Sequence, residues 1–306
     1  MADYAIYDVF TGAALTGNPL AVVFDADRFG DDEMQAIARE FNLSETVFIK
    51  TAESAGHTAL LRIFTPGREL PFAGHPTVGA AIALADRRLG GAVPANGIDL
   101  VKMLEEGVGP VRCGVRISTG EPGFAEFDLP RLSKRFDVDI EPADIGAALG
   151  LDPQEIGFEN HRVSLWSAGV PFVLVPVHDQ AAAAKAACNA AEWERVAPMA
   201  DGQLAYAYVY CRGGVHHTAS FHARMFAAFD GIGEDPATGS AAAALSGAIH
   251  DFDGLLEGNH ALVIEQGVEM GRPSLIHLHL DCANNSIRHA RVGGAAVKVA
   301  EGRLLL

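Results

Sequence analysis

Two segments far apart in the chain carry nearly the same pattern at the start of an alanine-rich helix. The first reads ELPFAGH over residues 69–75, and the second reads EDPATGS over residues 234–240. Each follows a strand-like segment with similar letters, RIF at 62–64 and RMF at 224–226. A third match pairs Gly17-Asn18-Pro19 with Gly271-Arg272-Pro273, each ahead of an apolar segment. An internal repeat of this kind predicts two related lobes.

The length of the chain agrees with this division. At 306 residues it exceeds the usual size of one core, and about 150 residues per domain favours two domains. We expect an N-terminal lobe over residues 1–128, which a last strand over 288–306 can complete, and a C-terminal lobe over 129–287. Hydrophobic residues make up 49% of the chain, which is enough for both cores. Two lobes also imply a cleft.

Helical and strand-like patterns mix without strict alternation, which favours an α+β fold over a doubly wound parallel sheet. The first predicted helix is capped by Asp31 or Asp32 and ends at Asn42. Small residues in the second helix, which Gly90 ends, suggest that a sheet wraps it closely. Further helices are predicted over 142–149, over 181–196 and from 239 onward. Strands are predicted over 4–9, 20–24, 46–49, 60–64, 171–177, 205–211 and 219–226, with short ones over 262–265, 275–280 and 290–299.

Charge and cysteine content exclude several classes of function. The net charge is −16 and no Lys/Arg block exceeds the pair Arg87-Arg88, so we expect neither nucleic acid nor an anionic membrane as a partner. The first residues lack a signal-peptide pattern, which predicts a cytoplasmic location. No phosphate-binding or dinucleotide-binding glycine motif occurs, and the histidines and cysteines lack metal-site spacing, so no cofactor and no metal are expected. The cysteines, read as reduced and buried, are Cys113, Cys188, Cys211 and Cys282.

The two glycine-marked helix openings suggest a ligand. If the lobes are related by a two-fold axis, both helix N-termini can face the cleft. Their N–H groups and partial positive charge would hold a carboxylate even in an acidic protein. Gly74 and Gly239 would allow the ligand to approach the backbone. The sequence therefore predicts a small organic acid as substrate.

Five motifs resemble the PhzF-like phenazine biosynthesis family in order and spacing, over nearly the whole chain. They are DVF at 8–10 with GNP at 17–19, NLSETVF at 42–48, GHPT at 74–77, DPATGSA at 235–241, and QG at 266–267 with GRPS at 271–274. The resemblance implies a diaminopimelate-epimerase-like fold. In that fold two pseudo-symmetric α+β lobes, each a mostly antiparallel sheet around a central helix, share an active site, commonly in a homodimer.

The same resemblance implies residue roles. The best-known member isomerises a dihydro-hydroxyanthranilate without a cofactor, and the glutamate of its N-x-S-E-T motif carries the proton, which here is Glu45. His75 and Asp235 would assist it as catalytic residues. From the residues alone, Glu45 could be a solvated surface residue, His75 a structural histidine, and Asp235 a helix cap. The expected substrate-binding residues are Gly74, Thr77, Thr238, Gly239 and Ser240, of which Thr77 and Ser240 could equally make helix-start hydrogen bonds.

Epimerases and racemases of the wider superfamily place a cysteine before the glycine at each helix start. Here Ala73 and Thr238 occupy those positions, and neither can act as a thiolate base. Racemisation by two thiols at these positions is excluded, and a one-base proton shuttle through Glu45 is favoured. Two alternatives remain open: an epimerase or racemase with other bases, and a non-catalytic small-molecule-binding homologue.

Overall fold

The computed structural model describes residues 1–227 and 232–306. It divides into two compact units: unit 1 is Met1–Pro130 with Gly293–Leu306, and unit 2 is Arg131–Val292. Most strand pairs are antiparallel, with a few parallel pairs among them, so the α+β class expected from the sequence is confirmed. Within the described residues, no helix is both long and apolar enough to cross a membrane.

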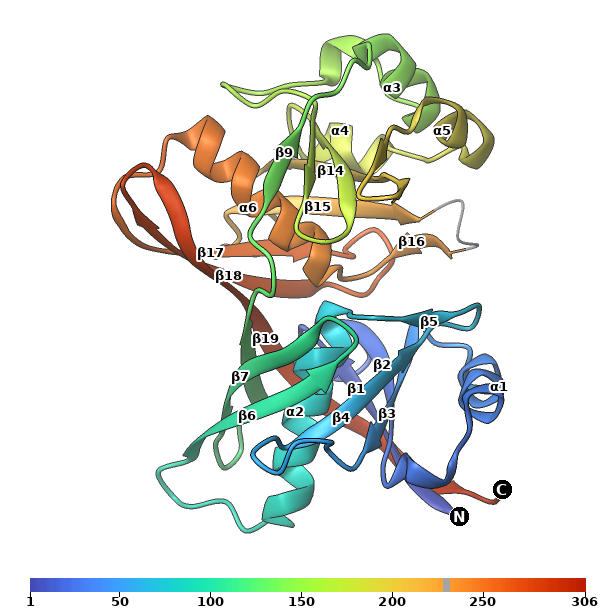
Figure 1. Ribbon diagram of the computed structural model, residues 1–306. Coiled ribbons are helices and arrows are strands. Elements are labelled where there is room, and N and C mark those ends of the chain that lie inside the picture. The colour runs from blue at the N-terminus through green and yellow to red at the C-terminus, as the bar shows by residue number, and fades with distance from the viewer. Residues whose placement is uncertain (228–231) are drawn as a thin grey trace. The chain divides into compact units, whose positions relative to one another are not determined.

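Unit 1 is a sheet built around one helix (Figure 1). Its strands are β1 (Ala2–Val9), β2 (Asn18–Val23), β3 (Glu45–Lys50), β4 (Ala59–Phe64), β5 (Glu69–Leu70), β6 (Ile98–Glu106), β7 (Gly109–Ile117) and β8 (Gly123–Asp128). Its helices are α1 (Asp31–Phe41), α2 (Gly74–Leu89) and a 3₁₀ turn at Ala26–Arg28. Strand β2 pairs parallel with β3 and antiparallel with β1, while β4 pairs antiparallel with β3 and parallel with β6.

Helix α2 is the centre of unit 1, as predicted. All residues from Gly74 to Ala83 are buried, and the helix packs against β1, β2, β3, β6, β7 and β8. A Cβ atom on Gly79 would lie 2.5 Å from Leu20 Cδ2 and 2.9 Å from Val9 Cγ2, so β1 and β2 approach the helix closely. Gly90, with φ 54°, ends the helix in the left-handed conformation that glycine adopts readily.

Unit 2 has a larger set of helices. Its strands are β9 (Lys134–Phe136), β10 (Ser164–Ser167), β11 (Pro171–Pro176), β12 (Met199–Ala200), β13 (Gln203–Leu204), β14 (Tyr206–Arg212), β15 (Phe221–Ala227), β16 (Ile232–Asp235), β17 (Gly258–Gln266) and β18 (Ser274–Ala283). Its helices are α3 (Pro142–Leu149), α4 (Gln180–Lys185), α5 (Ala190–Val196), α6 (Gly239–Asp253) and a 3₁₀ turn at Pro153–Glu155. Strand β19 (Ser286–Leu304) begins in unit 2 and ends in unit 1, where it pairs with β1.

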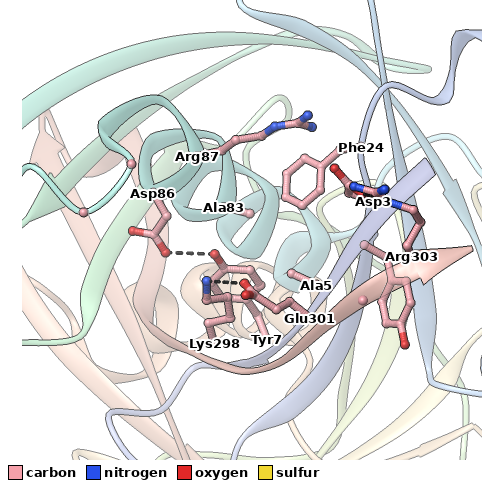
Figure 2. Close-up of a pocket in the computed structure, with 14 residues that line it drawn as sticks. Asp3, Ala5, Tyr7, Phe24, Ala83, Asp86, Arg87, Lys298, Glu301 and Arg303 are labelled. Atoms are coloured by element: carbon pink, nitrogen blue, oxygen red, sulfur yellow. Dashed lines mark hydrogen bonds and ion pairs between the residues drawn. The ribbon is translucent and has the colours of Figure 1, made fainter. Parts of the chain in front are cut away.

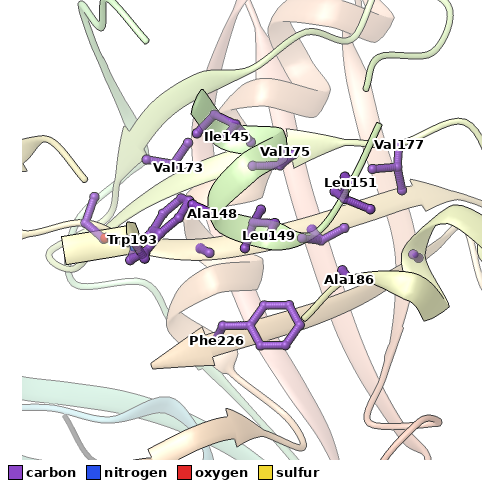
Figure 3. Packing of buried hydrophobic residues seen from close by; sticks show 14 of the residues in the cluster. Ile145, Ala148, Leu149, Leu151, Val173, Val175, Val177, Ala186, Trp193 and Phe226 are labelled. Atoms are coloured by element: carbon purple, nitrogen blue, oxygen red, sulfur yellow. Dashed lines mark hydrogen bonds between the residues drawn. The ribbon is translucent and has the colours of Figure 1, made fainter. Parts of the chain in front are cut away.

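Two layers bury the apolar side chains of unit 2. On one side, α3 supplies Ile145 and Leu149 and α5 supplies Trp193, which pack with Val175 and Phe226 from the strands (Figure 3). Helix α6 contacts β9, β10, β11 and β18, and is buried along most of its length. Unit 2 therefore also contains a central alanine-rich helix covered by strands.

The internal repeat is confirmed by strand pairing. The order β1-β2-β3-β4-β5-α2-β6-β7 in unit 1 matches β10-β11-β14-β15-β16-α6-β17-β18 in unit 2, with the same parallel and antiparallel pairs. The matched letters also make matched contacts. Arg62 on β4 pairs with Glu69 on β5, and Arg224 on β15 pairs with Glu234 on β16.

The third sequence match was wrong. Gly17-Asn18-Pro19 leads into β2, whose counterpart is β11, and β11 is preceded by Gly169-Val170 and begins at Pro171. Gly271-Arg272-Pro273 leads instead into β18, the counterpart of β7. Short turns rich in glycine and proline recur before many strands, so letters alone did not identify the equivalent turn.

The helix predicted over 181–196 is two helices. Helix α4 ends at Lys185, and the Asn189 side chain caps α5 by accepting a bond from the Glu192 N–H at 3.3 Å. Between them, the N–H groups of Ala187 and Asn189 donate to carbonyls at the end of α3. Helix α1 is capped by Gly30 rather than by Asp31 or Asp32, although Asn42 does end it.

Several strands differ from the sequence expectation. Strands β6 to β10 had no counterpart among the predicted elements. The last strands are long rather than short: β17 has 9 residues, β18 has 10 and β19 has 19. Strands β18 and β19 join through Asn284-Asn285, both with positive φ, which favours a tight two-residue hairpin and lets both strands extend.

Candidate active site

Glu45 and His75 lie side by side in unit 1. The Oε2 atom of Glu45 is 3.2 Å from the Nε2 atom of His75. The His75 side chain is 5% exposed and the Glu45 side chain is 14% exposed, so both groups are largely removed from solvent. The two residues of unit 1 to which the sequence assigned catalytic roles are thus in direct contact.

The parallel pairing of β2 and β3 explains this contact. Leu20 lies opposite Glu45, so both strands begin at the same edge of the sheet, and Asn18 is the first residue of β2. Helix α2 packs against both strands and places His75 in its first turn. The Nδ2 atom of Asn18 lies 3.3 Å from the Nδ1 atom of His75. Three chain segments therefore meet around one imidazole ring.

The hydrogen bond from Asn18 defines the tautomer of His75. An amide nitrogen only donates, so Nδ1 accepts and the ring proton is on Nε2, which faces Glu45. Burial lowers the pKa of His75 to about 3, so the ring is neutral near pH 7. The Nε2 atom is buried, and in the described part of the chain it makes no aligned hydrogen bond. His75 therefore presents a neutral N–H donor beside a carboxylate.

Thr77, a predicted substrate-binding residue, is fully buried two residues further along α2. Its hydroxyl group donates to the Ala73 carbonyl at 2.8 Å and lies 2.8 Å from Glu106 Oε1. This is the helix-start hydrogen bonding that the sequence left open as the alternative to substrate contact. Glu106 was not among the candidates, because its position at the end of β6 carries no recognisable motif.

The predicted residues of unit 2 gather at the start of α6. Thr238 occupies the N-cap position, so Asp235, at the end of β16, is not the helix cap. The Thr238 hydroxyl group donates to Asp235 Oδ2. Gly239 and Ser240 are the first two residues of the helix, the glycine buried and the serine half-buried. Asp235 and the predicted substrate-binding residues of this unit are thus close in space.

Gln266 holds this loop in place. Its Nε2 atom donates to the Asp235 carbonyl at 2.8 Å and to Thr238 Oγ1 at 3.0 Å, and its Oε1 atom accepts from the Thr238 N–H at 3.2 Å. Its side chain is fully buried at the end of β17. The sequence noted Gln266 only as part of a motif, and the structure gives it a supporting role.

A charged network lies behind the same loop. His222 contacts Glu265 at 2.8 Å and Glu269 at 2.9 Å, and Arg224 pairs with Glu234 at 2.8 Å. Burial by itself lowers the pKa of His222, but the hydrogen bonds to both carboxylates outweigh it and raise the pKa to about 9. Among residues 1–227 and 232–306, no group of three or more His, Cys, Asp or Glu side chains could hold a metal ion.

Comparison with known proteins decides the family. A family model described as phenazine biosynthesis-like protein, PhzC-PhzF, matches residues 7–302. The chain belongs to the PhzC-PhzF family. An uncharacterized isomerase from Mesorhizobium japonicum is 52% identical over 99% of this chain and 99% of its own length. A trans-2,3-dihydro-3-hydroxyanthranilate isomerase from Pseudomonas chlororaphis is 33% identical over 100% of both chains.

The solved structures agree on the fold. A Bacillus anthracis protein of the PhzF family matches with a TM-score of 0.87 over 100% of this chain and 99% of its own, at 24% identity. Epimerases are also among the structural matches, so the diaminopimelate-epimerase-like fold expected from the resemblance is confirmed. This PhzC-PhzF chain is accordingly an enzyme of the isomerase type.

A hollow of about 730 Å³ lies in unit 1 of this PhzC-PhzF chain, apart from the predicted site (Figure 2). It borders Asp86 and Arg87 near the C-terminal end of α2, whereas His75 is at the N-terminal end. Tyr7 donates to Asp86 Oδ2 at 2.8 Å, and burial raises the pKa of Asp86. None of the predicted catalytic or substrate-binding residues lines this hollow, so it is not the candidate active site.

Proposed function

We propose that this chain is a cofactor-independent isomerase that moves a proton on a small carboxylate-bearing metabolite, with Glu45 as the general acid and base. The observation that carries the proposal is the 3.2 Å contact between Glu45 Oε2 and His75 Nε2. A carboxylate and a neutral imidazole N–H at one point can serve different steps of a proton transfer.

The chemistry follows from these two groups. Glu45 as a carboxylate takes a proton from one carbon of the substrate, and the electron pair of that C–H bond moves into the conjugated system. His75 donates a hydrogen bond from Nε2 to the atom on which negative charge develops. Its low pKa keeps the ring a neutral donor rather than an imidazolium cation. Glu45 then returns the proton to a second carbon. Substrate and product have the same composition, so no oxidant or cofactor is needed.

The openings of both central helices are proposed to supply the remaining contacts. Gly74 at the start of α2 is proposed as a substrate-binding residue of unit 1, and Gly239 and Ser240 at the start of α6 as those of unit 2, through N–H groups and the serine hydroxyl group. Asp235 would assist the proton transfer by orienting a polar group of the substrate. Thr77 and Thr238 would support the helix openings, because their hydroxyl groups bond within the protein.

The proposed substrate class is a cyclic amino or hydroxy acid with conjugated double bonds. Two observations support this class: relatives at 33% identity are named for a dihydro-hydroxyanthranilate, and a one-base shuttle requires a conjugated path for the electron pair.

We also propose a homodimer in the cytoplasm. Light scattering coupled to size-exclusion chromatography measures the subunit number, and a monomer would contradict it.

An epimerase or racemase is the second candidate. Ala73 is the N-cap residue of α2 and Thr238 that of α6, so neither position offers a thiol. The buried thiols of Cys113 and Cys211 lie elsewhere, and burial raises the pKa of both. An epimerase would therefore have to pair Glu45 with a non-thiol base. Analysis of the product separates the candidates, because an epimerase inverts one carbon while an isomerase relocates a double bond.

The direct test is isotope exchange. Purified protein is incubated in heavy water with trans-2,3-dihydro-3-hydroxyanthranilate and a panel of related cyclic acids, and deuterium at carbon is followed by NMR. The proposal expects exchange and isomerisation by the wild type, loss of both in Glu45→Gln, and full activity in the matched control Glu40→Gln, an exposed glutamate of α1. Thermal stabilisation by these ligands without any turnover would favour a binding protein instead.

A further inference from the structure

Glu106 is a buried acid outside the residues assigned to the reaction. It is the last residue of β6, on the strand face that also buries Lys102 and Leu104, and it is 6% exposed. The next residue, Gly107, lies against the segment that leads into α2, since a Cβ atom there would be 2.8 Å from Pro71 Cα. Glu106 is therefore built into the wall that supports the first turn of α2.

The hydrogen bonds of Thr77 show which partner holds the proton. The Thr77 hydroxyl group has one proton and two neighbours at 2.8 Å, the Ala73 carbonyl and Glu106 Oε1. A carbonyl oxygen only accepts, so a hydrogen bond to Ala73 uses the single hydroxyl proton of Thr77. The second contact is then a hydrogen bond only if Glu106 donates. A protonated carboxyl group at Glu106 makes hydrogen bonds of both 2.8 Å contacts at once.

The other carboxyl oxygen supports the same assignment. Glu106 Oε2 is buried, and among the described residues it has no hydrogen-bond partner. A negative charge on this unpaired buried oxygen would cost far more free energy than the unpaired carbonyl oxygen of a neutral acid. Burial raises the pKa of Glu106 to about 8.

The charged groups around Glu106 do not compensate a negative charge. No ion pair is formed by Glu106 within residues 1–227 and 232–306. On the packed elements, His75 of α2 is neutral, burial raises the pKa of Cys113 of β7, and Arg62 of β4 pairs with Asp31 and Glu69. Burial lowers the pKa of Lys102 on β6 itself. The remaining charges of α2, at its other end, are Asp86, Arg87 and Arg88.

We propose that Glu106 is a positioning residue that, through a proton on its carboxyl group, holds the first turn of α2 and with it His75. The effect of Glu106 on catalysis rests on the proposed function, whereas its hydrogen bond with Thr77 does not depend on that function. When Glu106 ionises, it can no longer donate to Thr77, and the Thr77 hydroxyl group must turn from Ala73 toward the new carboxylate. The turn that carries His75 then loses one bond and gains a nearby negative charge.

The test is NMR of the ring nitrogens of His75 in the full chain, without substrate, between pH 6 and pH 9.5. The pKa of His75 itself is about 3, so a change in this range reports a neighbour. We expect the ring-nitrogen chemical shifts of His75 to change in one step near pH 8 in the wild type. We expect no such step in Glu106→Gln, because the amide keeps donating to Thr77 without titrating. Persistence of the step in Glu106→Gln, or its absence in the wild type, would overturn the proposal.

Two further variants separate positioning from general stability. Glu45→Gln should retain the step, which identifies Glu106 rather than Glu45 as its source. Glu106→Leu should shift the His75 signals at every pH and lower the exchange rate at least about tenfold, with rescue by Glu106→Gln. If Glu106→Leu does not fold, the carboxyl ¹³C signal of Glu106 in the wild type decides the question. A protonated carboxyl group at pH 6.5 supports the proposal, and an ionised one at that pH overturns it. Absence of any substrate exchange in the wild type would contradict the proposed function and leave this result standing.

Discussion

Asn18 and His75 form a buried contact of 3.3 Å that decides which ring nitrogen carries the proton. Because the Asn18 amide donates to Nδ1, the Nε2–H faces Glu45. Both residues lie at the starts of elements that pack together, β2 and α2. The orientation of the His75 imidazole is thus set by Asn18, which is not among the residues proposed to carry the proton.

Replacing Asn18 by aspartate should reverse the tautomer. A carboxylate at this position accepts from Nδ1–H, so Nε2 would become an acceptor and could no longer donate to the substrate. We expect a loss of about 10²-fold in exchange rate, which is the usual cost of removing one donor to developing charge. Ring ¹⁵N shifts of His75 report the tautomer, and an unchanged Nε2–H signal in Asn18→Asp would contradict this reading.

His75→Gln should lower kcat by about 10²- to 10³-fold while leaving the fold intact, because the neutral N–H donor is lost near the developing charge. The matched control is His217→Gln, an exposed histidine of unit 2. Steady-state kinetics on the substrate found in the exchange screen measures both. Equal rates for the His75 variant and the wild type would remove His75 from the mechanism.

Gln266→Leu should destabilise the loop before α6. The substitution removes four hydrogen bonds, one of them from the buried Tyr208 hydroxyl group, and leaves the Thr238 N–H buried without the amide oxygen that accepts from it. Each orphaned group costs about 1–3 kcal/mol. Urea unfolding gives the free energy of unfolding, and Gln154→Leu, at an exposed position, is the control. A change below about 0.5 kcal/mol, the usual range for surface substitutions, would show that Gln266 does not hold the loop.

His222 should make the stability of the protein depend on alkaline pH. Its pKa is about 9 in the folded chain, against about 6.5 for an unperturbed histidine. The folded state therefore binds the proton more tightly, so the stabilisation is complete below about pH 6.5 and is lost as the pH rises through about 9. The full effect is of the order of 3 kcal/mol. Unfolding curves at several pH values should show the difference between the wild type and His222→Gln shrinking from pH 6 to pH 10.

Local patterns predicted much of the fold. The capping glycine at 90, the small residues of the helix before it, and the strand letters around Arg62 and Arg224 are local signals, and the structure confirms each. The break between α4 and α5 was not predictable in this way, because bonds from Ala187 and Asn189 to the end of α3 produce it. Alanine-rich composition alone favours one continuous helix.

In the candidate site, too, local sequence signals could be predicted and contacts between distant segments could not. The motifs identified Glu45 and His75 as candidates, but their contact depends on the parallel pairing of β2 with β3, which is a tertiary feature. Glu106 and the supporting role of Gln266 depend on contacts between distant segments, so no local pattern marked them. The hydroxyl group of Thr77, a residue inside one of the motifs, bonds to the helix backbone at Ala73, a contact between residues four apart.

The most direct test of the central claim is deuterium incorporation into the isomerised substrate by Glu45→Gln. The variant keeps the size of the side chain but removes the base beside His75, so the account predicts a folded protein that still binds the ligand and shows no exchange above background. Exchange at the wild-type rate in this variant would contradict the account, because the proton would then be carried by another group.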